Sequence, residues 1–154
     1  MTGLPVAALQ RVLLTAWVGA LWAIGYLAVP VLFAGLDDRM QAGALAGKMF
    51  GAVGWLGVGC AIVVLVMQWM SRGHGLPVRV LGAVGVMLAL GMVGLFVVAP
   101  IMADLKAQAG PGGVMAGPLR DQFGTWHGVS SMLYLCQSLL GVYVVWRAGS
   151  VPTR

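Results

Sequence analysis

Charged residues are scarce in this sequence: Asp, Glu, Lys and Arg make up 8% of the 154 residues, whereas hydrophobic residues make up 60%. A typical soluble domain carries roughly 25% charged residues. A soluble core of this length could not bury so many apolar side chains, but a bilayer accepts them, because an apolar run of about 20 residues spans the hydrocarbon as a helix. The composition therefore excludes an ordinary soluble domain and predicts an all-α integral membrane protein.

Cysteine and clustered charge are also scarce. Cys60 and Cys136 lie deep in apolar runs and make neither a disulfide framework nor a CxxC motif, so we interpret both as buried small apolar residues. The nine basic residues stand singly at the ends of apolar runs. The net charge of +5 therefore does not indicate a nucleic-acid partner, and the bilayer is the expected one.

Four apolar runs predict a single transmembrane domain over residues 1–154, organised as a four-helix bundle. The expected spans are 12–36, 45–70, 80–103 and 123–146. The first run is too long for a signal peptide and is expected to be retained. A tight turn is expected at 71–79 and a longer irregular loop at 105–122, since both stretches contain Gly and Pro.

Glycine recurs every three or four residues in the second and third runs, which predicts close contact between helices. An unused glycine face would suit a homodimer or a partner membrane protein. The glycines concerned are Gly43, Gly47, Gly51, Gly54, Gly57, Gly82, Gly85, Gly91 and Gly94.

The two halves of the chain are similar in order. Val29-Pro30 closes the first expected helix and Phe50-Gly51 opens the second, while Ala99-Pro100 and Phe123-Gly124 do the same in the second half. This order favours two pseudo-repeated helical hairpins related by an axis along the membrane normal. Chance similarity between apolar hairpins is the alternative.

An even number of spans places both termini and the second connection on one side of the membrane. That side holds five basic residues and no acid, whereas the other side holds four basic residues and all four acids. The positive-inside rule then predicts cytoplasmic termini, and we expect a bacterial inner membrane protein.

His127 is the residue most expected to carry chemistry, because a titratable ring inside a span is costly unless it is paired or hydrated. Ser131, Tyr134 and Ser138 follow at i+4, i+7 and i+11, so one face of the fourth span is polar. Such a face is expected to point at the other helices or at a wet cavity. Hydrogen bonds across the bundle are one interpretation, and a ligand site near the non-cytoplasmic side is the other.

The ligand-site interpretation joins this face to charged residues on the same side of the membrane, with Asp104 as a further member. A small cation, a metal ion or an apolar molecule is the predicted ligand, bound or transported. Pairing among the charged residues is the alternative interpretation. The candidate ligand-binding residues are His127, Ser131, Tyr134, Arg39, Lys48, Arg120 and Asp121.

Haem and metal ions are the cofactors considered for His127. His74 falls in the opposite connection, which excludes a bis-histidine haem, so a haem-dependent membrane oxidoreductase would use His127 alone or with a methionine. For a metal ion, Asp104 and Asp121 are the nearest helpers, without a recognisable spacing. A structural or assembly subunit is the third hypothesis. No catalytic residue is predicted, since no acid completes a triad with His127 and Ser131.

Several short motifs give the chain a resemblance to a known family across nearly its whole length. The pattern resembles the small four-span membrane family named domain of unknown function 4149. The resemblance marks Arg39, Phe50, Phe123 and His127 as family-pattern positions and implies no mechanism. The motifs are Trp17-x-Gly19, Gly25-Tyr26, Val29-Pro30-x-Leu32-Phe33, Asp38-Arg39-x-x-Ala42-Gly43, Lys48-x-Phe50 and Phe123-x-x-Trp126-His127-Gly128-x-Ser130-Ser131.

Overall fold

Four long helices follow one another along the chain in the computed structural model, which describes residues 6–71, 75–110 and 112–149. Each is 30 to 32 residues long and apolar enough to cross a membrane, which confirms the all-α four-span architecture within these ranges. At about 1.5 Å per residue such a helix is roughly 45 Å long, so its ends extend beyond the hydrocarbon layer of about 30 Å. The spans are Val6–Gly35, Arg39–Met70, Val78–Gln108 and Arg120–Gly149.

Two of the spans are interrupted by a π-helical turn, and a short 3₁₀ turn precedes the last span. The expected turn residues Arg72 and His74 lie outside the described residues. The elements are α1 (Val6–Trp22), η1 (Ala23–Ala28), α2 (Val29–Gly35), α3 (Arg39–Met70), α4 (Val78–Val93), η2 (Gly94–Val98), α5 (Ala99–Gln108), η3 (Val114–Ala116) and α6 (Arg120–Gly149).

The helices begin earlier and end later than the apolar runs. α3 starts at Arg39 because the Asp38 carboxylate accepts hydrogen bonds from the backbone N–H groups of Met40 (2.8 Å) and Gln41 (3.2 Å), as an N-cap does. α5 likewise continues to Gln108, so the irregular loop expected over 105–122 is reduced to the residues around η3. Hydropathy reports the part of a helix inside the hydrocarbon, whereas capping sets where the helix begins.

Pro30 and Pro100 do not close helices, so this part of the predicted pattern is wrong. Each proline follows a π-helical turn, in which the Val29 N–H donates to Ile24 O and the Ala99 N–H donates to Gly94 O. A proline ring inside a regular α-helix clashes with the carbonyl four residues earlier, and a wider turn relieves that clash. The same device therefore stands at corresponding places in both halves, which supports the pseudo-repeat.

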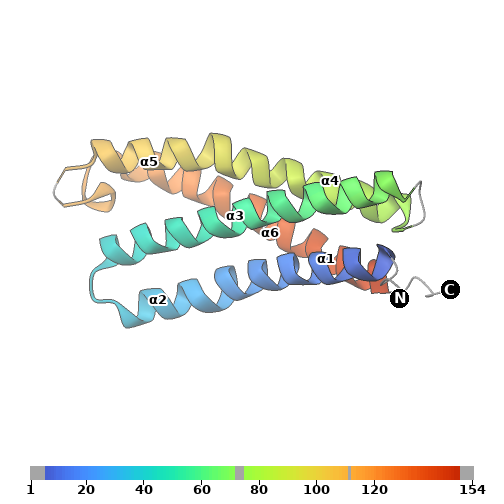
Figure 1. Ribbon diagram of the computed structural model, residues 1–154. Coiled ribbons are helices and arrows are strands. Elements are labelled where there is room, and N and C mark those ends of the chain that lie inside the picture. The colour runs from blue at the N-terminus through green and yellow to red at the C-terminus, as the bar shows by residue number, and fades with distance from the viewer. Residues whose placement is uncertain (1–5, 72–74, 111, 150–154) are drawn as a thin grey trace.

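The two ends of the bundle differ in how the helices meet (Figure 1). At the end that carries both termini, which we call the termini end, α1 and α4 each pack against both α3 and α6. At the opposite end, which we call the loop end, α2 packs on α3 while α5 packs on α6. Among the described residues the backbones of α2 and α6 do not approach each other, and Figure 1 shows the two helices diverging.

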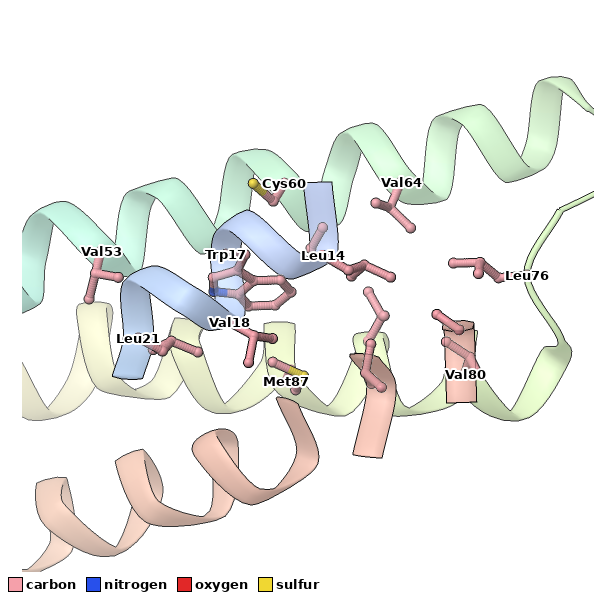
Figure 2. Packing of buried hydrophobic residues seen from close by; sticks show 14 residues of the cluster. Leu14, Trp17, Val18, Leu21, Val53, Cys60, Val64, Leu76, Val80 and Met87 are labelled. Atoms are coloured by element: carbon pink, nitrogen blue, oxygen red, sulfur yellow. The ribbon is translucent and has the colours of Figure 1, made fainter. Parts of the chain in front are cut away.

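The hydrophobic core fills the termini end and the middle of the bundle (Figure 2). The core contains side chains from α1 and α4 that are at most 1% exposed, namely Leu14, Trp17, Val84 and Met87. Residues of α3 and α6 complete it. α2, in contrast, contains no buried residue. The described residues therefore form one closed end and one end that is open on the side of α2, while Ala42 and Leu105 remain buried there.

Cysteine and glycine predictions are partly corrected. Cys60 is buried in the core, but Cys136 is exposed, because that side of α6 faces outward from the bundle.

Gly57 lies directly against the Trp17 indole and Gly54 against Leu95, as close helix packing requires. Other predicted glycines have open space where a Cβ would stand, namely Gly47, Gly51, Gly82, Gly85 and Gly94.

Candidate functional site

The predicted site residues belong to the loop-end half of the bundle but do not form one cluster. Arg39 and Arg120 are the first residues of α3 and α6, and both are exposed, as are Lys48 and Asp121. No hydrogen bond or ion pair connects these four side chains to one another within the described part of the chain. The predicted charge pairing is therefore not present there.

The polar face of α6 divides at Tyr134. Above it, toward the loop end, His127 and Ser131 are exposed, and the Ser131 hydroxyl donates to the His127 carbonyl at 2.8 Å. Below it, Ser138 is fully buried. The prediction that the whole face points into the bundle is right for the lower part and wrong for the upper part.

Neighbouring helices explain this division. α1 packs along the lower part of α6, and the Tyr134 hydroxyl donates to the Leu21 carbonyl at 2.6 Å. Beyond η1 the first span continues as α2, which packs on α3 and leaves α6. The upper part of the polar face is therefore uncovered because its neighbour departs, although the residues keep their helical alignment.

Aromatic rings mark the level at which the first span leaves α6. Tyr134 lies against Gly25, its ring centroid is 5.0 Å from that of Phe50 in an edge-on contact, and it is 6.2 Å from that of Tyr26. We call Tyr26, Phe50 and Tyr134 the aromatic boundary. Gly25, quoted above only as part of a family motif, is required here because a side chain there would collide with the tyrosine ring.

Lys106 contacts Phe123, the ring that lies beside His127, and is not among the predicted site residues. Its Nζ donates to the Gly43 carbonyl at 3.4 Å and lies 5.7 Å from the centre of the Phe123 ring. That ring stacks on the His127 imidazole, with centroids 6.1 Å apart and planes 11° apart. A basic side chain thus links α3, α5 and α6 beside the predicted histidine.

Acidic groups near this end have other partners or stand apart. Asp38 caps α3, and the Asp104 carboxylate accepts a hydrogen bond from the Gln108 amide at 2.7 Å. No group of three or more His, Cys, Asp or Glu side chains that could hold a metal ion occurs among the described residues. The donor set around His127 therefore does not fit a metal ion, and haem ligation by His127 stays a prediction.

Comparison with known proteins identifies a matching family. The family model described as Domain of unknown function (DUF4149) matches residues 12–111. The matched region contains Arg39, Lys48 and Phe50 and ends before α6, so His127 and Ser131 lie beyond it. No curated protein and no solved structure matches the chain.

Proposed function

The chain belongs to the membrane-protein family described as a domain of unknown function (DUF4149), and we propose that it binds an amphipathic molecule taken up from the bilayer. One observation carries the proposal: His127 and Ser131 on the polar face of α6 are exposed above the aromatic boundary, where the backbone of α2 has turned away from α6. A polar surface beside apolar and aromatic surface suits a ligand with a polar head and an apolar tail.

The polar part of the site favours a neutral or anionic head group. His127 and Ser131 are exposed, and the Lys106 ammonium lies over the neighbouring Phe123 ring. Asp38 and Asp104 already accept hydrogen bonds elsewhere. The acids that remain, Asp37 and Asp121, are outnumbered by the exposed basic side chains of Arg39, Lys48 and Arg120. Among the ligand classes predicted from the sequence, a molecule with an apolar part is therefore better supported than a small cation or a metal ion.

The apolar part of the site is the aromatic boundary. Rings that meet edge-on or tilted leave faces and edges available to an aliphatic chain. Tyr26 is 45% exposed, so the boundary is accessible from the lipid side without any change in the core. An apolar tail would lie against these rings while the head group contacts His127.

Binding is better supported than passage through the bundle. Below the boundary Leu14, Trp17 and Leu21 are at most 1% exposed and fill the space between the helices. A route to the termini end would require this core to open, at the cost of its packing contacts. We therefore place the protein among binding modules that take a molecule from one side of the membrane.

Photolabelling tests the proposal. The purified protein, in lipid nanodiscs, is exposed to a fatty acid carrying a diazirine and an alkyne, and the labelled peptides are mapped by mass spectrometry. We expect label on 127–134, and His127→Ala should reduce it about fivefold while the circular dichroism spectrum is unchanged. Met132→Leu is the matched control, since Met132 is 61% exposed on the same helix.

Uniform labelling of every exposed apolar face, or equal loss of label in both variants, would contradict the proposal. The haem hypothesis is tested separately, by a Soret band in protein purified from its own membrane. The assembly-subunit hypothesis is tested by co-purification of a second membrane protein.

A further inference from the structure

A groove runs between α1 and α6 on the outer surface of the termini half. It ends at Trp22, whose ring centroid lies 4.9 Å from that of Tyr26 in the aromatic boundary. The volume of the groove is ≈ 470 Å³ and Thr15 is the one polar residue in its lining. The groove is lined by Thr15, Val18, Gly19, Trp22, Val142, Val145 and Trp146.

Packing between the two helices creates the hollow. Outside the neighbouring backbone of its own helix, no atom lies within 4 Å of the position that a Cβ would occupy on Gly19, so this residue forms an open part of the wall. At the inner end the Trp22 indole is held by a hydrogen bond from its Nε1 to the Ser138 carbonyl at 3.4 Å. The groove therefore has a fixed inner end and an apolar lining.

Arg11 stands at the outer end of the same stripe of α1. Residues 11, 15, 18 and 22 recur at helical spacing and face one side of the helix. The Arg11 Nε donates a hydrogen bond to the Ala7 carbonyl at 3.1 Å. This bond directs the guanidinium toward the start of the helix and leaves the terminal nitrogens of Arg11 available. The helix rises about 16 Å from Arg11 to Trp22, close to half of a hydrocarbon layer of about 30 Å.

We infer that this groove holds one acyl chain of an anionic phospholipid from the leaflet at the termini end, with the lipid phosphate at the Arg11 guanidinium. The stripe of α1 from Arg11 to Trp22 has the length of one leaflet, its inner part from Thr15 to Trp22 lines the apolar groove, and the Arg11 charge fits a phosphate. The termini end has basic residues and no acid in the sequence, which adds to the attraction. A second copy of the chain fits less well, because a two-fold pairing would bring a second Arg11 to the same depth.

Native mass spectrometry in detergent containing equal amounts of phosphatidylglycerol and phosphatidylcholine tests the inference. Wild-type protein should retain phosphatidylglycerol preferentially. Arg11→Gln should reduce that preference about fivefold, the effect of one basic residue at an anionic surface. Arg79→Gln, an exposed arginine at the start of α4 and the same end of the bundle, should leave it unchanged.

Filling the groove tests the acyl chain separately. Gly19→Leu should reduce retention of the phospholipid by at least fivefold, whereas Gly59→Leu, an exposed glycine of α3 that also has open space, should not. Equal retention of the two lipids by wild type, or equal effects of Arg11→Gln and Arg79→Gln, would overturn the inference. So would an efficient disulfide-linked dimer of a Gly19→Cys, Cys136→Ser protein, which would assign the groove to a second copy.

Discussion

The termini end and the loop end are built from the same four spans, yet one is closed and the other is open. Leu14 and Met87 at the closed end are inaccessible, whereas Val31 of α2 is 60% exposed. Both regions are rich in apolar residues. In a bilayer, lipid solvates an apolar side chain about as well as a protein core does, so only packing decides which faces meet.

The π-helical turns show the difference most directly, because each half of the chain has one. After η2 the third span stays packed on α6, and Val98 and Leu105 are buried. After η1 the first span packs on α3 alone, and α2 has no buried residue. The same local device therefore leads to a closed contact in one half and to an open face in the other.

Leucine at a core glycine should have the largest effect. A side chain at Gly57 would collide with the Trp17 indole, which is 1% exposed and has no room to move. We expect Gly57→Leu to cost about 3 kcal/mol or more and to prevent purification of folded protein. Gly47→Leu on the same helix, with open space around it, should change stability by less than about 0.5 kcal/mol. A similar loss for both, measured by thermal unfolding, would mean that the loop end is closed as well.

Leucine truncation should give the next largest effect. Leu14→Ala removes a side chain with no exposed surface and should cost about 2 kcal/mol in unfolding free energy. This value is at the low end for buried leucine, because lipid also solvates the unfolded helices. Leu27→Ala, at 65% exposure, should cost less than about 0.5 kcal/mol in the same chemical unfolding measurement. Equal losses of unfolding free energy in the two variants would contradict the conclusion that the two ends are packed differently.

Cysteine scanning should locate the division of the polar face. In a Cys136→Ser background, Ser131→Cys should react with a membrane-permeable maleimide at least about tenfold faster than Ser138→Cys, because the reagent must reach a thiol to react with it. Ser131 is exposed and Ser138 is 0% exposed, although they lie on one stripe of α6. Mass spectrometry of timed samples gives both rates. Fast reaction at Ser138 would place the boundary lower than Tyr134.

Removing one hydroxyl should have the smallest effect. Tyr134→Phe loses the hydrogen bond to the Leu21 carbonyl, which should cost about 0.6 kcal/mol, a typical value for a hydrogen bond between membrane helices. Tyr143→Phe is the control, since Tyr143 forms no hydrogen bond in the described part of the chain. Thermal unfolding of both variants gives the difference, and an unchanged Tyr134→Phe would show that the aromatic contacts alone hold the boundary.

Hydropathy and spacing correctly predicted the number of spans and the central part of each. They also predicted the close packing at Gly54 and Gly57 and the polar stripe of α6. They placed the helix starts too late, because the Asp38 cap lies outside the apolar run. They also misplaced Pro30 and Pro100, since a π-helical turn keeps a proline inside a helix. The contact between Lys106 and Phe123 could not be predicted from the sequence, because it connects two different helices.

The sequence by itself determined that this is a four-span membrane protein, because the free energy of placing apolar runs in a bilayer depends on composition and length. It also determined which residues share a face of α6, because helical spacing is fixed. Only the tertiary structure decided that Ser138 is covered and that Ser131 is not. That outcome depends on where α2 leaves α6. Lipid and protein surfaces are nearly equal in free energy for an apolar helix, so composition does not decide this packing.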